Sequence, residues 1–175
     1  MVCPVIPQRR FRVLAAMLAI MPGCLAQTNL APRAAVPRDT AMPESPGDTL
    51  TGLIEAHNRE RARRGLPALS VDPRLEAAAS RHAADMASRR KMSHRGSDRS
   101  SPFQRMQAEG YQYRRAAENV AAGAFTLETL MNSWMNSPGH RRNILGPYTQ
   151  AGASFATGEG GTSYWCVTFG EPVRP

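Results

Sequence analysis

Helix start and stop signals, repeated along residues 51–145, constrain most strongly what this chain can fold into. The first predicted helix covers residues 53–64 and ends at Gly65-Leu66-Pro67, since Gly accepts the left-handed cap conformation and Pro cannot continue a helix. Asp72-Pro73 and Ser101-Pro102 each join an N-cap residue to a first-turn proline, and Thr126 is a further N-cap. These signals predict four short helices.

Apolar residues recur at helical spacing inside these segments and indicate which faces are buried. Gly110 closes the third helix, and Ser137-Pro138-Gly139 ends the fourth, because a residue before Pro is pushed out of the helical region. The predicted buried positions are Leu75, Ala79, His82 and Met86 in the second helix, and Leu127, Leu130, Met131 and Trp134 in the fourth.

Strand candidates lie between and after the helices. Residues 117–122 form a short apolar run, and the runs 151–156 and 162–169 flank Gly158-Glu159-Gly160-Gly161, which is typical of a hairpin. Helices, a strand, a helix and two strands follow one another in this order. The expected fold class is α+β, with a small antiparallel sheet between helices.

The residues before this domain have the composition of an export leader and a linker. Residues 1–26 combine an Arg-rich start, a short apolar run and the cleavage site Cys24-Leu25-Ala26, which predicts a secretory signal peptide. The apolar run is too short to span a bilayer. Residues 27–50 are rich in Pro and Ala and lack periodicity, so we expect a disordered linker before a domain at residues 51–175. Lipidation of Cys24 and twin-arginine export through Arg9-Arg10 are weaker alternatives.

Charge and cysteine content limit the partners of the mature chain. The formal net charge is +8 for the full chain and +5 after cleavage at Ala26, since the leader holds three arginines and no acidic residue. This charge favours an anionic envelope component or lipid headgroups as partner, and solubility is the alternative reason for it. Nucleic acid is not expected, because the arginines are scattered and aromatic residues make up only 6% of the chain. Cleavage after Ala26 leaves Cys166 as the single cysteine, so no disulfide can form within the mature domain, which must rely on a packed core. Membrane contact is expected only under the alternative in which Cys24 is lipidated.

Histidines and one carboxylate are the candidates for chemistry. His57 and His82 lie on helices, where a packing role is expected, and Asn58 beside His57 can tie down a neighbouring loop. His94 follows a helix in a polar, turn-rich segment and is free to face a cleft. Glu118 lies in an apolar run, and burying its carboxylate costs several kcal/mol unless a cation, a metal or a protonated His pairs with it.

His140 follows a helix terminator and is the third candidate. Two imidazoles and a carboxylate suit a divalent cation such as zinc, an acid/base cluster, or a buried polar network without chemistry. The three residues are far apart in the sequence, and no short ligand pair such as HExxH is present. Spacing alone leaves these alternatives open.

Five ordered stretches resemble the CAP superfamily (the SCP domain of cysteine-rich secretory proteins, venom antigens and pathogenesis-related proteins), and most of all its bacterial secreted branch. They are HNRERARRGLPALSVDPRLEAAASRHAADMA, MSHRGSDRSSPFQRM, AENVAAG, SWMNSPGHRRNIL and YWCVTFG. The resemblance implies a three-layer α-β-α sandwich with a central cleft that holds His94 and Glu118. The second Glu and second His of animal and plant members are absent, because Asn136-Ser137 and Pro147 stand near those positions. The resemblance places His140 in the same cleft instead.

The resulting hypothesis is a secreted or periplasmic monomer whose cleft binds a divalent cation, a lipid or another small polar ligand of the envelope. Ser93 and Asn119 complete the predicted binding cleft, and His94, Glu118 and His140 are the predicted metal ligands. A hydrolase that uses His94 and Glu118 as acid/base groups or as a metal site is the alternative. No nucleophile motif supports it, and Cys166 lies in an apolar strand where inert packing is expected.

Overall fold

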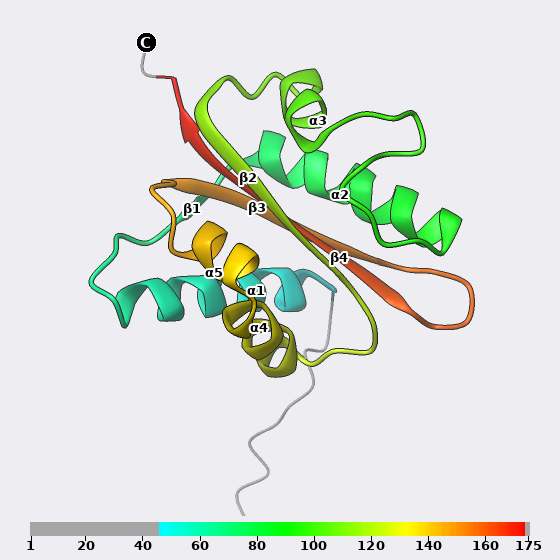
Figure 1. Cartoon of the computed structure of the whole chain (residues 1–175), viewed down its shortest axis with the longest axis horizontal. Coiled ribbons are helices and arrows are strands. Elements are labelled where there is room, and N and C mark those ends of the chain that lie inside the picture. Colours follow the sequence, from blue (N-terminus) through cyan, green and yellow to red (C-terminus); the bar gives the residue numbers. More distant parts are fainter. Residues whose placement is uncertain (1–45, 174–175) are drawn as a thin grey trace, which may run out of the picture. The chain divides into compact units, whose positions relative to one another are not determined.

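A computed structural model describes residues 46–173 of the chain, and the side chains from Thr49 onward (Figure 1). The signal-peptide prediction, the linker up to residue 45, Cys3 and Cys24 lie outside the described residues. The elements are α1 (Pro46–Ala62), β1 (Ser70–Val71), α2 (Pro73–Arg89), α3 (Pro102–Ala108), β2 (Tyr113–Ala122), α4 (Leu127–Asn136), α5 (Pro138–Ile144), β3 (Gln150–Thr157) and β4 (Ser163–Pro172).

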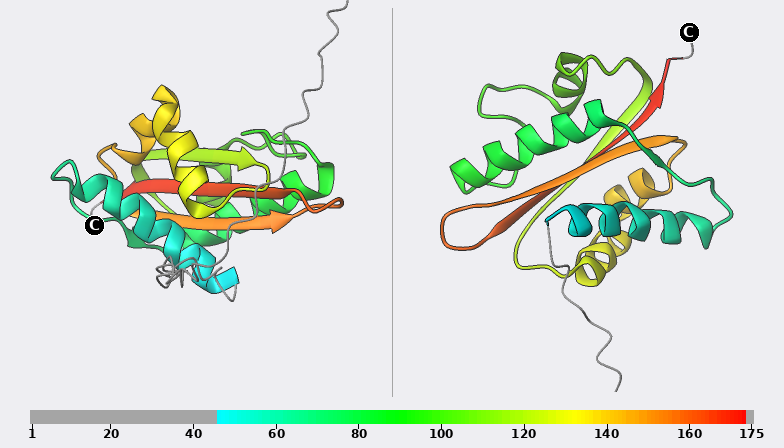
Figure 2. Two further views of the ribbon diagram at one scale, coloured as in Figure 1. Left: turned by 90° about the horizontal axis from the view of Figure 1, so that it is seen from below. Right: turned by 180° about the vertical axis from the view of Figure 1, so that it is seen from behind.

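The strands form one sheet between two helical layers. The strand order is β1-β3-β4-β2, so β2 is an edge strand. Helices α2 and α3 cover one face, and α1, α4 and α5 cover the other (Figures 1 and 2). This arrangement confirms the predicted α-β-α sandwich. The expectation of a purely antiparallel sheet was wrong in one respect: the two-residue strand β1, too short to show in a sequence pattern, pairs with β3 in parallel.

Two helix boundaries differ from the sequence prediction. Helix α1 begins at Pro46, so the last five residues of the expected linker are helical. Proline is well suited to the first turn of a helix, where its missing N–H has no intrahelical partner. The same property explains α5: Pro138 follows the end of α4, as expected, but it also opens a new helix that carries His140.

The core lies on both faces of the sheet. Leu53, Leu130, Trp134 and Phe169 are buried between the sheet and the layer of α1, α4 and α5. The Ala-rich face of α2 packs closely against the other face of the sheet, around Cys166. At Gly152 on β3, an added Cβ would lie 2.1 Å from the backbone nitrogen of Glu76 in α2. Only glycine permits this approach of a helix to a strand.

Polar side chains of α1 fix two loops. Asn58 donates to the Leu69 carbonyl over 3.0 Å and accepts from the Leu69 amide over 2.7 Å, which confirms the expected loop tie. Arg61, which is 1% exposed, was not anticipated from the sequence. Its guanidinium donates to the carbonyls of Pro67, Ile144, Gly146 and Tyr148 and so holds the chain that follows α5.

Among residues 46–173, no helix combines the length and the apolar character that crossing a bilayer requires.

A buried carboxylate at the edge strand

Glu118 is the centre of the candidate site. It lies in β2 opposite Thr168 of β4, and its side chain is 1% exposed. One carboxylate oxygen, Oε1, lies 2.9 Å from His94 Nδ1, and the other, Oε2, accepts a hydrogen bond of 2.7 Å from Arg105 Nη2. The buried carboxylate therefore has the cationic partner that the sequence argument required, and this partner is Arg105.

Arg105 connects several parts of the site. It lies in α3, whose start is fixed by a reciprocal capping box between Ser101 and Gln104. Besides Glu118, its guanidinium donates to the carbonyl of His94 over 3.1 Å and to that of Ser100 over 3.0 Å. Arg105 thus holds the carboxylate and the backbone of the His94 loop at the same time. Sequence reasoning missed it, although a buried Glu in a basic chain was a reason to look for an arginine partner.

The Glu118 contact decides which atom His94 presents. A carboxylate that is paired with an arginine accepts hydrogen bonds, so His94 Nδ1 carries the proton that it shares with Glu118. In the neutral ring, Nε2 then holds a lone pair. The side chain of His94 is 55% exposed, and the cleft that it is expected to face stays a prediction. Nε2 is therefore the atom that His94 offers to a ligand.

Ser93 and His82 support the His94 loop. His82, with a fully buried side chain, bonds through Nε2 to the Ser93 carbonyl at 2.7 Å and lies 3.8 Å from Glu118 Oε1. Burial lowers the pKa of His82, as expected for a packing histidine. The Ser93 hydroxyl accepts from the Arg95 amide over 2.9 Å. Ser93 is thus a turn residue whose backbone and hydroxyl shape the loop.

His140 approaches from the opposite layer. Its carbonyl accepts a hydrogen bond of 3.2 Å from Asn119, and its ring lies 6.2 Å from that of Trp134. Asn143 bonds both to Asn119 Oδ1, over 2.9 Å, and to the carbonyl of Glu118, over 3.2 Å. Asn119 is completely buried, so it anchors α5 to the edge strand β2. Burial, and then electrostatic repulsion from His94, lowers the pKa of His140.

The three predicted metal ligands do not contribute equivalent donors. Both oxygens of Glu118 are engaged, one by His94 and one by Arg105. Within residues 46–173, no group of three or more His, Cys, Asp or Glu side chains is arranged to hold a metal ion. The remaining ligand atoms are the imidazole nitrogens of His94, which is exposed, and of His140, which is half-buried, with Glu118 behind His94. A divalent cation at this cleft stays a prediction.

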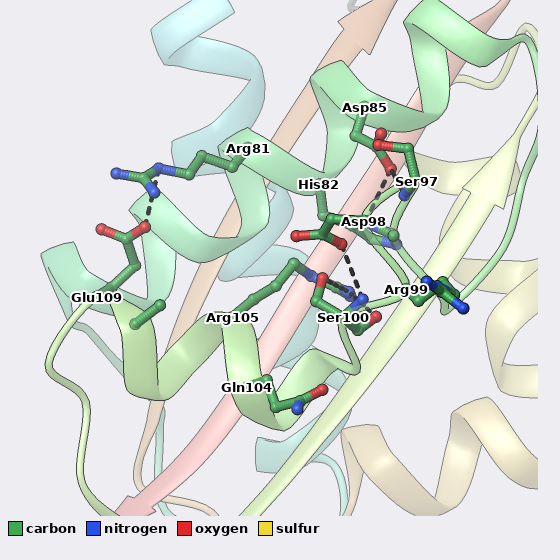
Figure 3. A pocket seen from close by; sticks show the side chains of 12 residues that line it. Arg81, His82, Asp85, Ser97, Asp98, Arg99, Ser100, Gln104, Arg105 and Glu109 are labelled. Carbon is green, nitrogen blue, oxygen red and sulfur yellow. Dashed lines mark hydrogen bonds and ion pairs between the residues drawn. The ribbon is translucent and has the colours of Figure 1, made fainter.

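A cavity of about 440 Å³ lies on the other side of Arg105, between α2, the loop 96–100 and α3 (Figure 3). It shares His82 and Arg105 with the Glu118 network. Several of its charged groups are paired: Arg81 bonds Glu109 over 2.9 Å, and Asp85 bonds Arg89 over 2.6 Å. This cavity contains neither His94 nor His140, so it is separate from the predicted cleft.

Comparisons with known proteins agree with this architecture. The model of the cysteine-rich secretory protein family (CAP) matches residues 54–169. The protein YkwD of Bacillus subtilis (strain 168) is 36% identical over 131 residues, which are 74% of this chain and 50% of YkwD. The chain thus spans half the length of this relative.

Solved structures show the same fold. An outer surface protein from Borrelia burgdorferi aligns with a TM-score of 0.66 at 22% identity, over 70% of this chain and 92% of that one. An extracellular SCP-domain protein from Bacillus anthracis str. Ames has a TM-score of 0.64 at 24% identity, over 74% and 44%. A cysteine-rich secretory protein from Staphylococcus aureus subsp. aureus Mu50 has a TM-score of 0.61 at 25% identity, over 73% and 40%.

The layered fold, with a buried glutamate and two histidines at its edge strand, defines a domain of the CAP, or SCP, type. The match to the family model extends from α1 to the end of the β4 core. The chain belongs to the cysteine-rich secretory protein family.

Proposed function

We propose that this chain is an exported CAP-domain protein whose cleft of His94, Glu118 and His140 binds a polar group of a cell-envelope component. The observation that carries the proposal is the engagement of both Glu118 oxygens, by His94 at 2.9 Å and by Arg105 at 2.7 Å. This arrangement turns the buried carboxylate into a support for His94 and leaves Nε2 as an outward acceptor. Export is supported by the leader-like residues 1–26 and by the extracellular or outer-surface names of the structural relatives.

The chemistry of the cleft favours a ligand that donates hydrogen bonds. In its neutral form His94 offers a lone pair on Nε2, and burial lowers the pKa of His140, which favours its neutral imidazole. Hydroxyl, amide and amine groups match such acceptors, and envelope glycans and peptides carry all three. A bare divalent cation would find two imidazoles but no free carboxylate oxygen on Glu118.

Calorimetric titration tests the proposal, with soluble peptidoglycan fragments as one probe and zinc chloride as the other. We expect saturable binding of the fragments to the wild type and its loss in His94→Ala and in His140→Ala. The matched control is Gln107→Ala. Gln107 is exposed on α3 and is not a sequence neighbour of either histidine. Equal binding by all variants refutes the cleft as the binding site. If zinc binds stoichiometrically and both His variants abolish this binding, the ligand of the cleft is a cation and the proposed polar ligand is refuted.

A hydrolase is the second candidate, and one observation favours it. The Glu118–His94 contact fixes the ring orientation and tautomer that a general base requires. Water is the nucleophile consistent with the site, since the Ser93 hydroxyl already accepts from a backbone amide. This candidate requires turnover of peptidoglycan fragments that His94→Ala abolishes while binding persists. Binding without turnover in the wild type excludes it for this substrate.

A further inference from the structure

A few cationic side chains of the described residues have no carboxylate or carbonyl partner. Most arginines between residues 46 and 173 form an ion pair with a carboxylate, as Arg114 and Arg115 do with Glu171, or donate to backbone carbonyls, as Arg61 does. Within the same residues, the cationic side chains without such a partner are Lys91, Arg95, Arg99, Arg141 and Arg142. Of these, Arg141 and Arg142 line a common cavity.

This cavity is a hollow of about 350 Å³ on the outer side of α5, lined by Asn136, Pro138, Arg141, Arg142 and Leu145. Both arginines are exposed. No carboxylate lines the hollow, and its charged groups are hydrogen-bond donors only. The larger cavity beside Arg105 differs, because Asp85, Asp98 and Glu109 line it together with its arginines. Compared with that cavity, the α5 hollow combines unpaired cations with the absence of a competing anion.

The chemistry of these groups selects an anion. Two guanidinium groups on consecutive residues repel each other, and an anion between them removes this repulsion. Each guanidinium presents a planar fork of N–H donors that matches two oxygens of a phosphate or carboxylate. The amide of Asn136 supplies a further donor, while Pro138 and Leu145 form an apolar wall. We infer that the hollow on α5 is a binding site for a phosphate-type anion, separate from the His94 cleft and independent of the function proposed for that cleft.

Titration of the full chain with inorganic phosphate at low ionic strength tests this inference by NMR, through the side-chain Nε resonances of arginine. We expect saturable shifts at Arg141 and Arg142 that added salt weakens. In the double variant Arg141→Gln/Arg142→Gln, which lacks these two resonances, calorimetric titration with phosphate should show no saturable binding, while the wild type binds. The control Arg114→Gln/Arg115→Gln removes the same net charge from exposed arginines elsewhere and should keep both the shifts and the binding. Absence of saturation, or equal loss in both double variants, overturns the site.

Two further measurements keep the result specific. Because Arg141 and Arg142 have no side-chain partner among the described residues, their double variant should melt within about 2 °C of the wild type. His94→Ala should leave phosphate binding intact, so failure of the cleft and failure of the hollow are distinguishable. Vesicles identify the source of the anion: binding to phosphatidylglycerol but not phosphatidylcholine, lost in Arg141→Gln/Arg142→Gln alone, indicates a lipid headgroup. Binding of phosphate without vesicle binding indicates a soluble anion.

Discussion

His57 links the stability of this domain to pH in a way that can be measured. The residue is fully buried in α1, where Nδ1 donates to the Leu53 carbonyl over 2.8 Å and the ring packs at 5.6 Å from both Trp134 and Phe169. Its Nε2 atom is buried without a partner. Desolvation by burial, opposed by the Leu53 bond, lowers the pKa of His57 from 6.5 to about 4.

The direction of the effect follows from which state binds the proton. Above pH 6.5 the ring is neutral in both states, and its titration does not affect stability. As the pH falls from 6.5 towards 4, the unfolded chain takes up a proton that the folded protein refuses, so the free energy of unfolding decreases. The shift corresponds to about 3 kcal/mol in full, of which about 2 kcal/mol appears between pH 7 and pH 5.

Urea denaturation of the wild type and of His57→Leu, at pH 7 and at pH 5, measures this contribution. Leu is apolar and of similar size, so the variant is expected to fold, whatever its absolute stability. The lowered pKa values of His82 and His140 act in the same direction in both proteins and cancel in the comparison. The lowered pKa values of Asp72, Asp85 and Asp98 matter only below about pH 4. If both proteins lose the same free energy between the two pH values, the burial argument for His57 is wrong.

The other predictions concern the packing and the ion pair behind the site. Arg105→Met leaves Glu118 buried without its cation and should lower the free energy of unfolding by about 3 kcal/mol in urea; a loss below about 1 kcal/mol contradicts the pairing. Arg61→Met leaves four carbonyls without their donor and should lower the free energy of unfolding in urea by about 2–4 kcal/mol. An unchanged denaturation midpoint would contradict this. Gly152→Ala forces a methyl group against α2 and should lower the melting temperature by several degrees, at a cost of about 1–3 kcal/mol. Cys166 is completely buried with a raised pKa, so a thiol reagent should react with it only after unfolding; fast labelling of the native protein opposes this.

The sequence predicted the layers of this fold because its local signals are strong. The caps at Asp72, Ser101 and Thr126 are all present, and the glycine-rich hairpin lies between β3 and β4. The boundaries that were wrong, at Pro46 and Pro138, involve a residue that can either end one helix or start another. Only the tertiary contacts of α1 and α5 decide between these outcomes.

The candidate site was only partly predictable for a related reason. His94 was expected to face a cleft, and Glu118 was expected to need a partner, since both conclusions depend on the polarity of short segments. The identity of that partner depends on the approach of α3 to the edge strand, which no local pattern encodes. The same holds for Arg61, whose carbonyl partners include three that lie more than 80 residues further along the chain.

The state of the His94 ring nitrogens during ligand addition tests the proposed cleft most directly. Long-range ¹H–¹⁵N NMR should show His94 with a protonated Nδ1, as the Glu118 bond requires. Addition of soluble peptidoglycan fragments should then shift the Nε2 resonance while Nδ1 stays protonated, and Arg105→Met should disturb both signals. A ring protonated at Nε2 instead, or a His94 signal that does not move while the fragments bind, would contradict the proposed role of the Glu118–His94 pair.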